Sequence, residues 1–263
     1  MQIPEAFFVA DGGDFVATEY TSGPWDPRAQ HGGPPAGLLV GQIERAARLA
    51  NPQLQTIRVT IDLVRPVPVG RVTLGSLEPL RQGRRVAEWR GSLSADGKVC
   101  LRAQVLLLSE LALPTGRAAA APSLPPFANL PTTEFSFFRQ PIGYHKAVDL
   151  RWAVGTWGSP PCGAWGRQRV PLILGQDPLP IERTLVVADA ANGVGAALPL
   201  GRFSFVNADL TVALFRPLAG EWVGLLVDTA ISSAGIGQTH ATIEDERGPI
   251  GYGLQHLVIA AAS

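Results

Sequence analysis

The chain has 263 residues, of which 46% are hydrophobic and 17% are charged, and its formal net charge is zero. This composition fits a globular protein with a large core, and the length fits two domains of ordinary size. The balanced charge gives no support to nucleic acid or an anionic membrane as a partner, and no apolar run is long enough to span a bilayer.

Cysteine and histidine usage gives no sign of a metal site or a disulfide framework. Cys100 and Cys162 stand alone without CxxC spacing, and the four histidines show no metal-ligand spacing. Residues 1–5 lack the charged start and the apolar core of a signal peptide. We therefore expect a cytoplasmic protein with reduced cysteines and without a bound metal.

The first half is predicted to form one long helix followed by a meander of strands. The helix should run from Pro34 to about Ala50, because two prolines occupy its first turn and its apolar residues recur at helical spacing. Gly37 and Gly41 lie four residues apart, so another backbone could approach the helix closely there. Alternating residues predict strands at 57–65, 69–79, 84–93 and 99–109, and Asp96-Gly97 predicts a hairpin turn.

A segment rich in Ala and Pro, residues 114–134, separates the halves and has the composition of a linker. In the second half, Asp177 is the expected N-cap of a helix that ends near Asn192-Gly193. Within that helix, Asp189 is interpreted as a polar interruption. Strands are predicted at 146–157, 163–174, 208–216, 222–231, 237–244 and 250–260.

The two halves share a sequence signature. Leu63-Val64-Arg65-Pro66 recurs 151 residues later as Leu214-Phe215-Arg216-Pro217, and the same shift places Gly97 on Gly248 and Gln104 on Gln255. Similarity at about half the chain length indicates a tandem duplication of one domain. We therefore predict an N-terminal domain at 1–113, the linker at 114–134 and a C-terminal domain at 135–263.

Three motifs resemble the type II acyl-CoA thioesterases. They are the Gly-Gly helix start at Gln30-His31-Gly32-Gly33-Pro34, the segment Asp209-Leu210-Thr211-Val212 before Phe215-Arg216-Pro217, and the final strand at Gly251-Tyr252-Gly253-Leu254-Gln255. The resemblance implies an α+β double hotdog, in which two copies of a long helix are each wrapped by a curled antiparallel sheet. It also implies an acyl-CoA thioester hydrolase without a cofactor, with coenzyme A present only as part of the substrate.

The resemblance also implies a set of site residues. Asp209, Thr229 and Gln255 would hold the water that attacks the thioester, and Ser232 is the reserve for the hydroxyl. Gly32 and Gly33, with His31 before them, would bind substrate and stabilise the oxyanion, because a helix start has unpaired N–H groups and a favourable dipole. Arg58 occupies the position in the first copy that corresponds to Asp209, which predicts one site in the duplicated chain.

Two other functions stay open from the sequence. One is an acyl-CoA-binding protein without catalysis. The other is a hydratase or dehydratase acting on acyl-CoA, for which His31 would be the catalytic histidine. Sheet edges left by the fold predict a homodimer.

Overall fold

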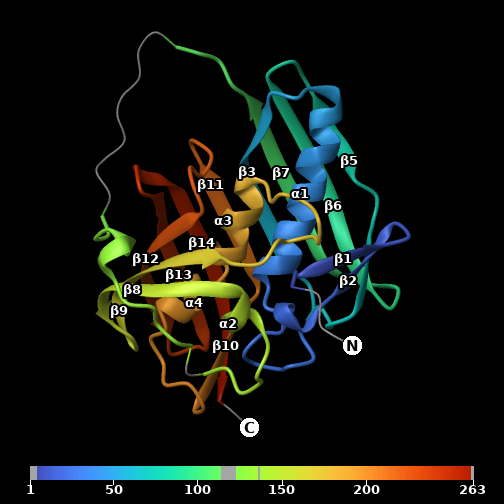
Figure 1. Cartoon of the computed structure of the whole chain (residues 1–263). Coiled ribbons are helices and arrows are strands. Elements are labelled where there is room, and N and C mark those ends of the chain that lie inside the picture. Colours follow the sequence, from blue (N-terminus) through green and yellow to red (C-terminus); the bar gives the residue numbers. More distant parts are fainter. Residues whose placement is uncertain (1–4, 114–122, 136, 262–263) are drawn as a thin grey trace.

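The computed structural model describes residues 5–113, 123–135 and 137–261 (Figure 1). One continuous antiparallel sheet runs through this part of the chain, in the order β1-β2-β4-β6-β7-β3-β11-β14-β13-β12-β9-β8, with β5 beside β6 and β10 beside β14. Its strands are β1 (Phe8–Asp11), β2 (Asp14–Ala17), β3 (Leu54–Leu63), β4 (Arg71–Leu74), β5 (Glu78–Gln82), β6 (Val86–Ala95), β7 (Lys98–Ser109), β8 (Val148–Thr156), β9 (Ser159–Gln168), β10 (Phe203–Asn207), β11 (Asp209–Leu214), β12 (Trp222–Ser232), β13 (Ile236–Asp245) and β14 (Gly248–Ala261). The helices are η1 (Glu19–Thr21), α1 (Gly33–Ala50), η2 (Phe127–Asn129), α2 (Tyr144–Ala147), α3 (Pro180–Ala188) and α4 (Ala191–Val194).

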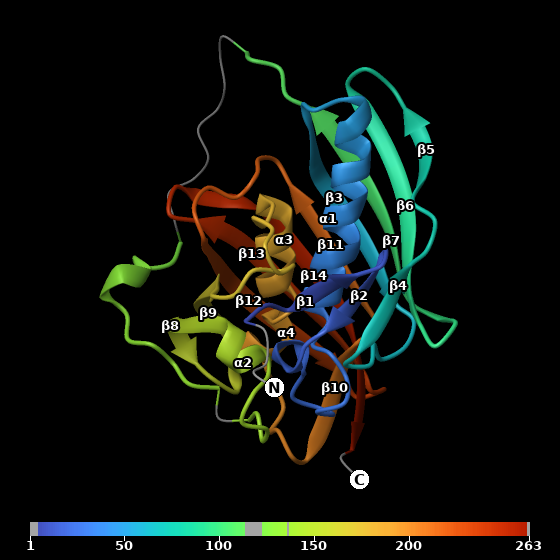
Figure 2. The ribbon, with the colours of Figure 1, turned by 45° about the vertical axis from the view of Figure 1, so that its right-hand side comes forward.

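Each half of the sheet curls around its own helix, α1 in the N-terminal half and α3 in the C-terminal half (Figure 2). Leu38, Leu39 and Ile43 of α1 are fully buried and belong to the same core cluster as inward-facing residues of β3, β6 and β7. Burial of this apolar stripe is the main force that holds the sheet around the helix. The α+β double hotdog expected from the sequence is confirmed.

The two halves meet at two places. In the sheet, β3 pairs with β11, with Thr60 opposite Thr211. Between the helices, α1 presents glycines to α3, and a Cβ at Gly33 would lie 2.4 Å from the backbone oxygen of Val186. A Cβ at Gly41 would likewise overlap the side chain of Glu182. The close helix approach that the glycine spacing predicted is therefore present, and α3 makes it.

The helix predicted from Asp177 to about Asn192 is shorter and broken. It begins after Leu179, whose N–H donates to the Glu182 carboxylate at 2.7 Å and is thereby capped. It ends at Asp189, and α4 starts two residues later. Asp189 is the C-cap and keeps helical backbone angles, so it continues the face of α3 that packs on α1 through Glu182 and Val186.

The segment expected to be a linker has two parts. Residues 114–122 lie outside the described residues. Residues 123–134 are fixed to the C-terminal half, where Ser123 and Leu124 donate N–H groups to the Glu244 carboxylate at 2.9 and 2.8 Å. Trp165 Nε1 also donates to the Pro125 carbonyl at 2.9 Å. Residues 123–134 therefore pack as part of the C-terminal domain instead of connecting the halves freely.

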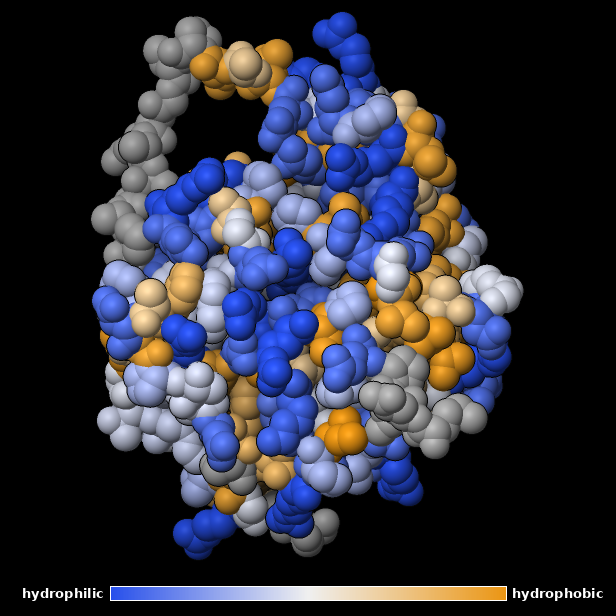
Figure 3. All heavy atoms as spheres, in the orientation of Figure 1, coloured by the Kyte–Doolittle hydropathy of each residue, from blue (hydrophilic) through white to orange (hydrophobic). Residues whose placement is uncertain are grey.

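Hydrophilic side chains cover much of the face in Figure 3, and hydrophobic ones gather there in smaller groups. Cys100 and Cys162 are buried free thiols. Among the described residues, no helix combines the length and the apolar character needed to cross a membrane.

Candidate active site

A cavity of about 930 Å³ lies between the two halves, at the end of the fold where α1 begins. Both halves line it. The N-terminal half contributes the loop before α1 and residues 63–67, and the C-terminal half contributes Tyr144 and most of the segment 189–208. The wall is mainly apolar, so a polar group that faces this cavity is a candidate for chemistry.

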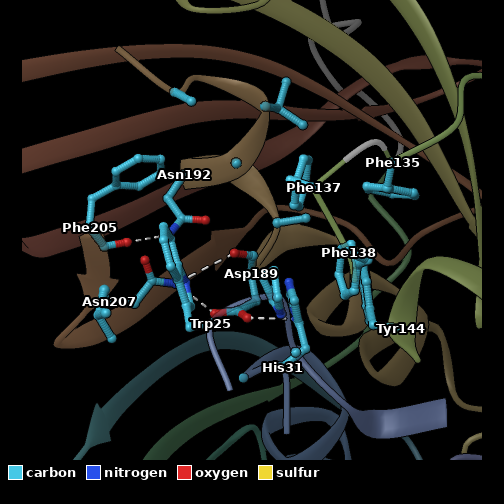
Figure 4. Close-up of a pocket in the computed structure, with 18 of the residues that line it drawn as sticks. Trp25, His31, Phe135, Phe137, Phe138, Tyr144, Asp189, Asn192, Phe205 and Asn207 are labelled. Atoms are coloured by element: carbon cyan, nitrogen blue, oxygen red, sulfur yellow. Dashed lines mark hydrogen bonds and ion pairs between the residues drawn. The ribbon is translucent and has the colours of Figure 1, made fainter. Parts of the chain in front are cut away.

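Among the acids that line the cavity, Asp189 is the buried one, whereas Asp26 and Glu134 are more exposed. Asp189 lies near the centre of the close-up in Figure 4. Its side chain is only 4% exposed. One carboxylate oxygen, Oδ2, lies 3.0 Å from Nδ1 of His31, and the other, Oδ1, accepts a hydrogen bond from Nδ2 of Asn207 at 2.9 Å. A carboxylate buried to this degree requires such partners, because unpaired burial of a charge is strongly unfavourable.

Gln255 binds the backbone of Asp189 on the side away from the cavity. Its Nε2 donates to the backbone oxygen of Asp189 at 3.1 Å, and its Oε1 accepts the N–H of Asn192 at 3.1 Å. The side chain is 1% exposed, and it is not among the residues that line the cavity. Both ends of this amide are therefore committed to the turn between α3 and α4, and its geometry suits positioning of Asp189 better than direct contact with water.

His31 is fixed by a ring below it. Its imidazole stacks on the phenol of Tyr144, with ring centroids 3.8 Å apart and an interplanar angle of 6°. Tyr144 in turn donates its hydroxyl to the backbone oxygen of Val186 at 2.8 Å. Burial, together with the nearby Asp189 charge, raises the pKa of Tyr144 well above its usual range, so Tyr144 stays a neutral hydrogen-bond donor.

Two neighbours of His31, the Asp189 carboxylate and the N–H of Gly33, determine whether its Nδ1 carries the proton. Nδ1 lies 3.0 Å from the Asp189 carboxylate and 3.3 Å from the N–H of Gly33. The shorter contact to a carboxylate is favourable only when Nδ1 carries a proton, and a protonated Nδ1 cannot accept from Gly33. The geometry therefore favours an imidazole that donates to Asp189.

The start of α1 meets Asp189 directly. Pro34 and Pro35 have no N–H, so Gly32 and Gly33 supply the N–H donors at the positive end of the helix. Gly32 lines the cavity, whereas Gly33 is buried against Val186 of α3. A Cβ on Gly32 would lie 2.9 Å from Oδ2 of Asp189, so only glycine leaves the carboxylate where it is.

Gly32→Ala is therefore expected to displace the Asp189 carboxylate. Overpacking of this kind costs roughly 1–3 kcal/mol of stability, and a reacting group moved by about 1 Å can lose about 100-fold in rate. We expect the kcat/KM of the reaction at this site to fall by about 10- to 100-fold, measured beside a thermal unfolding curve. Unchanged kcat/KM in a folded variant would show that the contact between Gly32 and Asp189 has no role in turnover.

The structure corrects the assignment of Asp209. In β11, Leu210 and Val212 face the core, so Asp209 faces the outer side of the sheet. Its carboxylate accepts the backbone N–H of His256 at 2.7 Å and lies 2.9 Å from Nδ1 of that histidine. Asp209 does not line the cavity, and Gln255 lies on the opposite face of the sheet.

The predicted hydroxyls also lie away from the cavity lining. Thr229 Oγ1 is 2.9 Å from Thr239 Oγ1, between β12 and β13. Ser232 is exposed, and its Oγ accepts the N–H of Ala234 in a turn. The structure thus brings His31, Gly32 and Gln255 to Asp189, and it leaves Asp209, Thr229 and Ser232 elsewhere.

Asn207 is a second polar group at the cavity that the sequence did not indicate. It is the last residue of β10 and lines the cavity beside Asp189. Its Oδ1 is buried and has no hydrogen-bond partner among the described residues. Sequence reasoning missed Asn207 and discounted Asp189. The available signal was an acid inside the apolar run 185–191 without a basic residue three or four positions away to pair with it.

Both halves of the chain match models of one protein family. Residues 21–108 match the acyl-CoA thioesterase N-terminal domain, and residues 118–259 match the acyl-CoA thioesterase C-terminal domain. The chain belongs to the acyl-CoA thioesterase family. The resemblance to type II acyl-CoA thioesterases is thus confirmed, and so is the prediction of an enzyme that hydrolyses thioesters.

Solved structures agree on the architecture. A hotdog-fold protein of unknown function from Alicyclobacillus acidocaldarius has a TM-score of 0.71 and 16% identity, covering 97% of this chain and 96% of its own. The acyl-CoA thioesterase II TesB2 of Mycobacterium marinum has a TM-score of 0.64 and 18% identity, covering 88% and 90%. A TesB protein of Mycobacterium avium subspecies paratuberculosis has a TM-score of 0.63 and 16% identity, covering 97% and 96%. These identities establish a shared fold only. No curated protein sequence matches the chain significantly.

Proposed function

We propose that this acyl-CoA thioesterase hydrolyses its substrate in the cavity between the halves, with Asp189 as the base. The observation that carries the proposal is a buried carboxylate at the start of α1, facing an apolar cavity of about 930 Å³. A general base must reach the attacking water in a position set by fixed neighbours. His31, Asn207 and Gln255 supply those neighbours for Asp189.

The attacking water would lie between Asp189 and Asn207. Asn207 uses its Nδ2 on the Asp189 carboxylate, which leaves its buried Oδ1 as an acceptor without a partner among the described residues. A water that donates one proton to Asp189 and the other to Asn207 Oδ1 would point a lone pair toward the thioester carbon. Such a water also satisfies an oxygen whose burial without a partner is costly.

The carbonyl oxygen would gain its negative charge beside the start of α1. The N–H of Gly32 lies at the positive end of that helix, where an oxyanion is stabilised. The apolar cavity wall strengthens this interaction, because charges act more strongly where water is excluded. Pro34 and Pro35 set the helix geometry there without adding competing donors.

The proposed reaction balances without a further reactant. The water oxygen bonds to the carbonyl carbon while Asp189 takes one of its protons. The tetrahedral intermediate then collapses, the carbon–sulfur bond breaks, and the electron pair leaves with sulfur. The thiolate of coenzyme A recovers the proton from Asp189, and the products are the free acid and coenzyme A.

Release of free thiol from acyl-CoA esters tests this proposal directly. Purified full-length protein is expected to release one thiol for each ester consumed, measured with a coloured disulfide reagent. Binding of acyl-CoA without thiol release would instead indicate the non-catalytic protein that the sequence left open.

The contact between His31 and Asp189 favours a second candidate function, hydration of an unsaturated acyl-CoA. The 3.0 Å pairing of His31 and Asp189 places a histidine and an acid, the groups that a hydratase needs, at one cavity. An enoyl-CoA substrate separates the two reactions. Loss of the conjugated double bond without thiol release would support the hydratase, and thiol release would support the hydrolase.

A further inference from the structure

The cavity wall is unusually rich in aromatic rings. The chain has 10 Phe, 6 Trp and 3 Tyr residues, and eight of these aromatic residues line the cavity. Figure 4 shows Asp189 between two groups of rings, with Trp25 and Phe205 on one side and Phe135, Phe137, Phe138 and Tyr144 on the other. The polar centre of the site is therefore flanked by aromatic side chains.

The rings are fixed to one another and to the backbone. Phe137 and Trp157 stack with an interplanar angle of 8° and centroids 6.1 Å apart, and Phe138 stacks on Tyr144 at 6.4 Å and 19°. Trp157 Nε1 donates to the carbonyl of Gly193 at 2.9 Å, which anchors the indole beside α4. Trp25 packs edge-on against Phe205 at 5.0 Å. The Phe137–Trp157 and Phe138–Tyr144 pairs therefore give the wall flat faces, whereas Trp25 and Phe205 meet at 82°. Trp157 is 40% exposed and is held by its hydrogen bond to Gly193.

We infer that the acyl group of the preferred substrate is aromatic, and that Trp157 determines this specificity; the inference rests on the proposed thioester hydrolysis. A planar ring placed against Phe137 and Trp157 gains stacking contacts beyond the burial of its area. A straight chain of equal carbon number gains less from flat walls and loses more rotational freedom when it is bound. Side chains that are already held by contacts, such as Trp157, lose little further conformational entropy when the substrate binds.

Phenylacetyl-CoA and octanoyl-CoA give a matched test, because both acyl groups contain eight carbons. We expect the kcat/KM of the full-length protein to be at least about tenfold higher for phenylacetyl-CoA, since each ring pair is worth roughly 2- to 10-fold. Trp157→Leu should remove most of this preference, so that the ratio of the two kcat/KM values falls by several-fold. Trp157→Phe should retain most of the preference, because a ring remains.

Phe215→Leu is the matched control. Phe215 is 60% exposed and does not line the cavity, so its loss should leave the ratio of the two kcat/KM values unchanged. An octanoyl-CoA rate equal to or above the phenylacetyl-CoA rate would overturn the aromatic inference and leave the hydrolase intact. A ratio unchanged by Trp157→Leu would overturn the role of Trp157.

A binding measurement separates failure of the inference from failure of the proposed function. Non-hydrolysable thioether analogues of the two substrates can be titrated while tryptophan fluorescence is followed. If neither ester is hydrolysed but the phenylacetyl analogue binds about tenfold more tightly, the aromatic site stands and the hydrolase proposal fails. If neither is hydrolysed and the two analogues bind equally, both fail.

Discussion

Replacing Asp189 by Asn is expected to lower kcat for thiol release by about 10²- to 10⁴-fold, the usual contribution of a general base. The amide is nearly isosteric, and its single oxygen can still accept from Nδ2 of Asn207. Its NH2 group would face His31, whose neutral ring can offer an unprotonated Nδ1 as an acceptor, so the fold should survive. What it loses is the ability to take a proton from water. Thiol release under saturating acyl-CoA measures the effect, and a thermal unfolding curve checks that the variant is folded.

Asp209→Asn is the matched control for this experiment. It makes the same chemical change 20 positions along the chain, on the outer face of β11, where the carboxylate contacts His256 and not the cavity. We expect its kcat to stay within about threefold of the unmodified protein. Full activity of Asp189→Asn together with an inactive Asp209→Asn would return the base to Asp209 and refute the site described above.

The second large effect concerns the buried ion pair between the helices. Glu182 of α3 has a side chain that is 1% exposed, and its carboxylate accepts from the guanidinium of Arg45 of α1 and from the N–H of Leu179. Arg45→Met leaves that carboxylate buried without its cation. We expect a loss of about 3–5 kcal/mol in the free energy of unfolding at pH 7, as for other buried pairs broken on one side.

The loss should shrink as the pH falls. Burial raises the pKa of Glu182 above its ordinary value of 4.5, although Arg45 opposes the shift, and removal of Arg45 raises it further. A carboxyl whose pKa is higher in the folded state takes up a proton on folding, so stability falls as pH rises above 4.5 and recovers as pH drops back toward it. Urea unfolding at pH 7 and pH 5 should therefore show a smaller deficit at pH 5.

Arg90→Met serves as the control for this pair. Arg90 bonds Glu78 on the surface, where both side chains are largely exposed, and such pairs contribute little to stability. We expect almost no change in unfolding free energy and no dependence of that change on pH. A deficit for Arg45→Met that is equal at both pH values would mean that lost packing, and not a stranded Glu182, causes it.

The repeated Arg-Pro motif shows what duplication preserves. In the second copy, Arg216 donates to the Asp245 carboxylate at 2.8 Å and to the Gly248 carbonyl at 2.9 Å, which fixes the end of β11 to the β13–β14 turn. In the first copy, Arg65 is exposed at the cavity. The motif therefore indicates the duplicated fold correctly, while its arginines have different surroundings in the two copies.

The sequence by itself determined the elements and their repetition, because these follow from local patterns. The prolines and apolar spacing of α1, the alternation of β3 and the Asp96-Gly97 turn each depend on neighbouring residues, and the 151-residue shift exposes the duplication. These features also carried the family resemblance. They fixed the double hotdog and placed Gly32 at the start of α1.

Only the tertiary structure decided which acid meets that helix start. Asp189 reaches the start of α1 because it lies on the face of α3 that packs against that helix, and Gln255 and Asn207 from distant strands bind it there. Asp209 points outward because β11 must bury Leu210 and Val212 against the core. The placement of Asp189 at the cavity and of Asp209 on the outer face both depend on contacts between residues far apart in the chain. A local sequence pattern cannot predict such contacts.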